Sequence, residues 1–196
     1  MTKLKRNLII IIVTTSFLVM SALLVIHIVQ RIHHYKSGIW ECEISDFKKL
    51  KKSFDLVSDK LWECYFEEKE KNNIEYLYAD GFSKEALRYV CIVNDKEQYT
   101  VSVDLTEDLG QAFMMIYDAF LKKNKYYGLH SIRVHEEQVS FMAERYPYYA
   151  VIRVTGSSRP NYLVSPEDDF EFYVEKITGN WYQGIQTSTQ PRKFVP

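Results

Sequence analysis

Residues 8–29 form one unbroken apolar run, LIIIIVTTSFLVMSALLVIHIV, in which His27 is the only strongly polar residue. An α-helix rises about 1.5 Å per residue, so a helix of this length reaches about 33 Å and matches the apolar thickness of a bilayer. A cleavable signal is the alternative, but its apolar part is usually about 7–15 residues long. Here residues 23–26 continue the run past the faint cleavage site at Ser21-Ala22. The run therefore predicts a transmembrane helix.

The charges on either side of the run predict its orientation. The short tail, residues 1–7, carries Lys3, Lys5 and Arg6, whereas the flank at residues 31–36 carries two basic side chains. Basic flanks tend to stay in the cytoplasm. We therefore expect a single-pass protein of the cell membrane with its N-terminus in the cytoplasm and everything after the run outside. A group of lysines within 48–52 weakens this bias.

The residues after the run are enough for one globular domain. Residues 1–36 hold five of the 25 Lys/Arg residues and none of the 26 Asp/Glu residues, so residues 37–196 have a net charge of 20 − 26 = −6. This negative charge disfavours nucleic acid as a partner. The sequence also lacks the common hydrolase, nucleotide-binding and zinc-protease motifs. We expect no cofactor.

Two segments have the periodicity of helices that bury one face. The first is expected over about 46–71, with Ser45 as its N-cap. The second is expected over about 107–123, with Thr106 as its N-cap. The apolar stripe of the first comprises Phe47, Leu50, Phe54, Val57, Leu61 and Cys64. The stripe of the second comprises Leu109, Ala112, Phe113, Ile116, Phe120 and Leu121.

The rest of the domain has the alternation and turn residues of strands. We expect a turn at Gly81 and Ser83 and strands over 74–78, 86–93, 98–105, 131–135, 139–144, 148–155, 170–177 and 181–186. Short connections favour antiparallel pairing of consecutive strands. The predicted fold is α+β, with a curved antiparallel sheet packed on two helices. The predicted divisions are a tail at 1–7, the span at 8–29, a juxtamembrane linker at 30–44, a single domain at 45–186 and a flexible tail at 187–196.

The closing hairpin, Gly179-Asn180-Trp181-Tyr182-Gln183-Gly184-Ile185, resembles the Gly-x-Trp ending of NTF2-like and cystatin-like domains. In these domains a curved sheet closes over a long helix and leaves a pocket. The resemblance implies such a cone-like fold over about residues 45–186. It also implies kinship with membrane-anchored scaffold subunits and small extracytoplasmic binding domains. It assigns no functional residue.

Cysteines and histidines are the main candidates for chemistry. Cys42, Cys64 and Cys91 are odd in number and form no Cys-x-x-Cys motif. We expect buried thiols, with a Cys42–Cys64 disulfide as the alternative. His130 and His135 are expected on opposite faces of one strand, where they cannot share a metal. No metal or catalytic residue is assigned.

Aromatic side chains are the main candidates for binding, because such residues dominate interfaces. The predicted partner surface comprises Tyr148, Tyr173, Trp181 and Tyr182. We expect a membrane-anchored, non-catalytic binding or scaffold module of the cell envelope, with a protein or peptide partner. The alternative is a membrane-tethered enzyme or small-ligand-binding protein with a pocket in the cone-like fold.

Overall fold

The structure, a computed structural model, describes residues 14–26, 28–29, 44, 46–94, 96–123, 128–143, 148–156, 159–160 and 170–188. The chain divides into two compact units, residues 1–40 and 41–196. In the first unit residues 14–26 and 28–29 are helical, and the other residues of the predicted span lie outside the described residues. Within the described part of the chain, no helix combines the length and the apolar character needed to cross a membrane.

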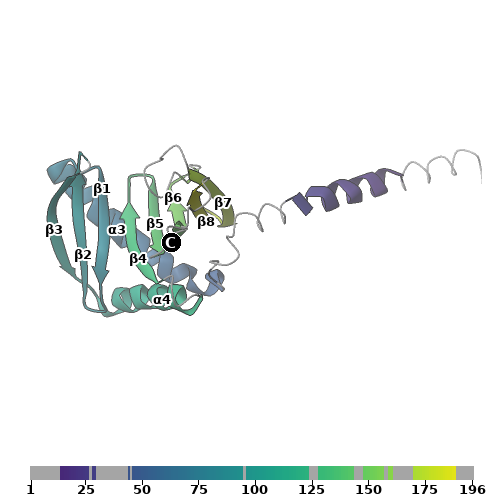
Figure 1. The fold of residues 1–196 in the computed structure, drawn as a ribbon. Coiled ribbons are helices and arrows are strands. Elements are labelled where there is room, and N and C mark those ends of the chain that lie inside the picture. The colour runs from purple at the N-terminus through teal and green to yellow at the C-terminus, as the bar shows by residue number, and fades with distance from the viewer. Residues whose placement is uncertain are drawn as a thin grey trace, which may run out of the picture. The chain divides into compact units, whose positions relative to one another are not determined.

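The second unit is α+β with one antiparallel sheet, as predicted (Figure 1). Its helices are α3, Phe47–Asn72, and α4, Glu107–Lys123. Its strands are β1, Tyr76–Phe82; β2, Ala86–Val93; β3, Lys96–Asp104; β4, Leu129–Val134; β5, Gln138–Ala143; β6, Tyr148–Val154; β7, Phe170–Thr178; and β8, Trp181–Ser188.

The sheet has the strand order β3-β2-β1-β4-β5-β6-β8-β7. Most of it consists of two similar halves: α3 is followed by β1, β2 and β3, and α4 is followed by β4, β5 and β6. The first strands of the two halves pair at the centre, with Leu77 opposite Val134. The β7–β8 hairpin then extends the sheet beyond β6. The larger part of the domain therefore repeats one helix-and-three-strand unit.

The expectation that consecutive strands are neighbours is wrong after β6. This strand pairs with β8, with Ile152 opposite Tyr182, while β7 pairs only with β8 among the described strands. The segment 155–169 connects β6 to β7. A connection of this length does not fix its two strands as neighbours, unlike a tight turn.

The core lies between α3 and the sheet and is aromatic. Phe54 is fully buried and packs edge-on against Phe141, with ring centroids 4.9 Å apart. Trp181 is also fully buried, and its ring centroid lies 5.4 Å from that of Phe54 and 5.3 Å from that of Phe47. Because each buried aromatic ring removes a large apolar area from water, this cluster is a main stabilising contact between α3 and the sheet.

Arg153, in β6, adds charged contacts beside this core. Its guanidinium lies over the rings of Trp62 and Trp181, at 5.2 and 5.6 Å from their centroids. One Nη donates to the Asp59 carboxylate at 2.7 Å and to the Asp55 carbonyl at 3.2 Å. The Asp55 carboxylate also accepts the Trp181 indole N–H at 2.9 Å. These bonds tie the middle of α3 to β6 and β8.

The ends of α3 agree with the predicted bounds but not with the predicted cap. Ser45 lies outside the described residues, and the N-cap residue is Asp46, in a left-handed conformation with φ 62°. Its carboxylate makes no cap hydrogen bond and accepts one from the Lys49 ammonium at 3.2 Å. At the other end Asn73 is left-handed, and its N–H donates to the Lys69 carbonyl at 2.9 Å, which satisfies an end carbonyl.

Two glycines allow close approaches near the connection from β1 to β2. Gly81 was expected in a turn, but it lies within β1 opposite Arg88, at an irregularity of the pairing. Gly110 lies near the start of α4, where an added Cβ would lie 1.8 Å from the Lys84 carbonyl oxygen. The start of α4 therefore packs directly on the backbone that joins β1 to β2.

Phe113 packs α4 into the core, so a substitution at this residue tests the position of the helix. It is fully buried and stacks on Phe82, with ring centroids 5.5 Å apart. We predict that Phe113→Asp unfolds residues 41–196, because an unpaired buried charge costs several kcal/mol. Gln111→Asp, at an exposed position of the same helix, is the matched control. Thermal unfolding followed by near-UV circular dichroism measures both; equal melting temperatures would show that α4 is misplaced.

Candidate functional site

A pocket of about 290 Å³ opens where α3 begins. The start of α3 and strands β6, β7 and β8 all contribute to its wall. The lining residues are Ile44, Asp46, Phe47, Lys48, Tyr149, Ile177 and Gln183. Its volume is at the lower end of the range for small-molecule sites, and apolar walls with a few polar groups are typical of such sites.

The polar groups of the pocket differ in burial. Tyr149 and Gln183 are 1% and 5% exposed, and the Tyr149 hydroxyl donates to Gln183 Oε1 at 3.4 Å. That hydroxyl also accepts the Ile44 N–H at 3.3 Å. Asp46 and Lys48 are exposed, and the Asp46 carboxylate is paired with Lys49. The inner wall is therefore held in place by neutral hydrogen bonds, while the rim carries charge.

Sequence reasoning kept a pocket as the alternative but predicted none of its lining residues. Ile44 was assigned to the juxtamembrane linker, but it is only 5% exposed and lines the pocket. A signal was present: Ile44 precedes Phe47 by three residues, so it continues the spacing of the helix stripe. Tyr149 and Gln183 carried no such signal, because only strand pairing brings β6 and β8 together.

A second polar cluster lies between α3 and the first half of the sheet. The Glu68 carboxylate is buried and accepts the Tyr99 hydroxyl at 2.5 Å, the Tyr89 hydroxyl at 3.4 Å and the Asn72 amide at 3.1 Å. Burial, together with nearby charge, raises the pKa of Tyr89 and Tyr99 well above the ordinary value. Both phenols therefore stay protonated donors at neutral pH, and they hold the Glu68 carboxylate together with the Asn72 amide.

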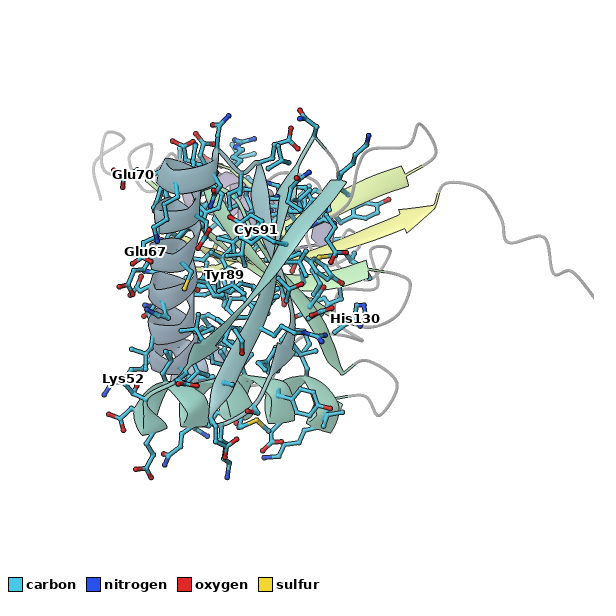
Figure 2. The ribbon with its side chains drawn as sticks, turned by 90° about the vertical axis from the view of Figure 1, so that its left-hand side faces the viewer. Lys52, Glu67, Glu70, Tyr89, Cys91 and His130 are labelled. Atoms are coloured by element: carbon cyan, nitrogen blue, oxygen red, sulfur yellow. The ribbon has the colours of Figure 1, made fainter. Side chains whose placement is uncertain are left out.

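The cysteines beside this network are not activated. Figure 2 shows Cys91 and Tyr89 on the strand side of the gap to α3, with Glu67 on the outer side of the helix. Cys64 and Cys91 are buried free thiols, as predicted. Burial raises the pKa of Cys64 to about 11 and also raises the pKa of Cys91. Since the thiolate is the nucleophile, neither thiol is poised for catalysis at neutral pH. Cys42 lies outside the described residues.

The two histidines have different surroundings. His130 is exposed on β4, whereas His135 follows β4, is half-buried and packs its ring on Tyr76 with centroids 5.2 Å apart. Burial, and then the charge of Arg133, lowers the pKa of His135 to about 4. Within the described residues, no group of three or more His, Cys, Asp or Glu side chains is arranged to hold a metal ion.

The predicted aromatic surface does not form one face. Trp181 is fully buried in the core, so its place in this surface was wrong. Tyr173 lies opposite Ile185, and Tyr182 lies three residues before Ile185. Alternation along a strand therefore sends Tyr173 and Tyr182 to opposite faces of the sheet. Tyr148 lies in β6, and its side chain is outside the described set.

Neither protein-family models nor curated proteins nor solved structures match this chain. The resemblance to NTF2-like and cystatin-like domains therefore stays a prediction, and the site must be interpreted from its own geometry.

His135 makes the stability of the domain depend on pH. Its pKa of about 4 in the folded chain lies below the ordinary value of 6.5, so the unfolded chain binds a proton first as the pH falls. We predict that stability is retained above pH 6.5 and decreases from there towards pH 4, by up to about 3 kcal/mol. Urea unfolding at several pH values in this window measures the loss.

His135→Phe, which keeps a ring on Tyr76, should reduce this acid dependence. His130→Gln controls for the removal of one histidine at an exposed position. An unchanged pH slope in His135→Phe would contradict the assignment.

Proposed function

We propose that this chain is a membrane-anchored, non-catalytic binding module whose domain lies outside the cytoplasm. The apolar run at residues 8–29 supplies the anchor. In its described part, ten large apolar side chains between Phe17 and Val29 are 46–71% exposed. Burial of one such side chain contributes about 1.5–3 kcal/mol, so this helix is strongly stabilised by an apolar environment such as lipid.

The Ser21 side chain of this helix is compatible with lipid. The Ser21 hydroxyl donates to the Phe17 carbonyl at 2.9 Å, one turn earlier in the same helix. In a bilayer every polar group needs a partner within the protein, and this bond provides one. The three basic residues of the tail support the cytoplasmic placement of the N-terminus.

The pocket at the start of α3 is the observation that carries the binding function. Ile44, Phe47 and Ile177 offer apolar walls, and Lys48 offers one ammonium group at the rim. Since Asp46 is already paired with Lys49, the charge of the lining that has no counter-charge among the described residues is the positive charge of Lys48. This combination suits a small amphipathic ligand with an apolar body and one anionic group.

The alternative, a membrane-tethered enzyme, has less support. Catalysis by acid, base or nucleophile needs titratable groups placed together in a pocket. Among the described residues, the lining of this pocket has no His or Cys, and the buried Glu68 lies in a separate hydrogen-bond network. The protonated thiols of Cys64 and Cys91 give no nucleophile.

The anchor and its orientation can be tested in intact cells. With epitope tags at both ends of the full chain, we predict that external protease removes the C-terminal tag and leaves the N-terminal tag protected. The physical reason is the basic tail before the apolar run. Immunoblotting of intact and permeabilised cells measures both tags. Protection of the C-terminal tag together with loss of the N-terminal one would reverse the orientation.

The ligand class can be tested with decanoate and decanol, which share an alkyl chain and differ in charge. We predict that the purified full chain binds decanoate saturably and binds decanol more weakly, because Lys48 stabilises the anionic group. Ile177→Trp should abolish binding by filling the pocket, and Lys48→Glu should remove the preference for the acid. Isothermal titration calorimetry measures each affinity.

Lys52→Glu is the matched control, because Lys52 is exposed on the same helix but outside the pocket lining (Figure 2). It should keep the preference for decanoate. Equal affinities in the wild type and in Ile177→Trp would refute the pocket as the binding site.

A further inference from the structure

The two ends of the sheet differ in how well they are protected against pairing with another strand. Among the described strands, β3 and β7 are the edges, and Figure 1 shows β3 as the outermost strand on its side. The side chains of β3 alternate between exposed and half-buried from Tyr99 to Asp104. A strand edge carries unpaired backbone N–H and C=O groups, which makes it a template for a further strand.

Natural edges are usually protected by charged side chains, proline or short length. The β7 edge follows this rule, because the charged residues Glu175 and Lys176 interrupt it. The β3 edge is nine residues long, and its pairing with β2 is irregular near the start, between Glu97 and Tyr99. The regular stretch after this point, residues 99–103 with the sequence YTVSV, holds neither charge nor proline. This edge is therefore open to a partner.

The internal repeat of the fold provides a precedent for such pairing. β3 and β6 are the third strands of the two similar halves. The outer edge of β6 is occupied by β8 in antiparallel pairing from Tyr148 to Arg153. No described strand occupies the equivalent position beside β3. The third strand of the second half thus accepts an added antiparallel strand, and no described strand lies beside the third strand of the first half.

We propose that the β3 edge pairs with β3 of a second copy of this chain, in antiparallel orientation about a two-fold axis at Val101. This inference rests on the proposed membrane anchor, because the anchor supplies the high local concentration that the pairing needs. In the proposed register Val101 faces its own counterpart, Tyr99 faces Val103 and Thr100 faces Ser102. A pair of an aromatic and a β-branched residue is stabilising across two strands, and so is a pair of two hydroxyl residues. The sequence of β3 is therefore complementary to itself.

The charges of β3 also fit this register. Asp104 meets the irregular end of the other β3, near Gln98, so no two like charges are opposed. Lys96 and Glu97, at the start of the strand, fall beyond the paired stretch. An isologous interface of this kind closes as a dimer and leaves no further edge of the same type.

The area covered by one strand pair is small, so the pairing is weak in dilute solution. Two anchored copies share one membrane plane, which raises their effective concentration without any new contact. The anchor and the open edge therefore support each other: the anchor supplies the concentration that a short strand pair needs.

Cysteine cross-linking of the full chain in native membranes tests the pairing and its register. Two differently tagged copies carry Thr100→Cys and Ser102→Cys, each with Cys42→Ser so that Cys64 and Cys91, which are buried, are the remaining native thiols. Both replaced positions are exposed. Mild oxidation should give a mixed-tag disulfide dimer on a non-reducing gel, in larger yield than either copy gives with itself.

Copies with Val174→Cys and Lys176→Cys, which are spaced alike on the β7 edge, are the matched control and should give no such dimer. In the cross-linking background, Gln98→Glu should reduce the yield by about fivefold because it brings a second carboxylate near Asp104, and Gln98→Lys should preserve or increase it. The proposal is overturned by equal yields at both edges, by cross-links to another protein instead, or by a Thr100→Cys copy that stays unlinked and is freely labelled by maleimide.

Alkaline extraction of the same membranes tests the proposed anchor independently of the strand pairing. If the chain is extracted into the soluble fraction, the proposed anchor fails. Cross-linking of that fraction at increasing concentration then still decides the pairing, because a mixed-tag dimer that rises with concentration supports it and its absence refutes it.

Discussion

The cation of Arg153 fixes how the long helix lies on the sheet. Its side chain is 16% exposed and held between two tryptophans, so its charge needs carboxylates close by. Asp55 and Asp59 provide them from one face of α3, and the Trp181 indole donates to the same Asp55. A helix rotated or shifted by one turn would leave this charge unpaired. The ion pairs of Arg153 therefore set the position of α3 on the sheet, and with it the packing of the aromatic core and the place where α3 begins.

Local patterns were enough to predict the helices and strands, but not how distant segments meet. The stripe from Phe47 to Cys64 marks the start and the buried face of α3, because one buried face imposes its period on the sequence. The contact between Asp55 and Arg153 spans 98 positions and has no local signature. The order of β7 and β8 was hidden for the same reason, since a long connection leaves strand order open.

The candidate site was less predictable than the fold. The prediction of one aromatic surface was wrong because Tyr173 and Tyr182 lie on opposite faces of the sheet. Which face each tyrosine takes depends on the register of the β7–β8 hairpin, and the sequence does not give that register. Trp181 was predicted to be a binding residue but is the centre of the core. The pocket combines Ile44, Tyr149 and Gln183, which are joined only once the strands have paired. Sites of this kind are properties of the topology rather than of a motif.

The two halves of the domain repeat one topology but have different roles for their outer strands. In the second half the added β7–β8 hairpin covers the edge of β6, and the same hairpin contributes Ile177 and Gln183 to the pocket. One extension thus closes an edge and builds a wall of the candidate site. The first half lacks this extension among the described strands, which leaves β3 uncovered and uncharged at its centre. Selection against aggregation normally removes such an edge. Its presence here is explained if a second copy covers it on the membrane, so that ligand binding and self-association occupy opposite ends of one sheet.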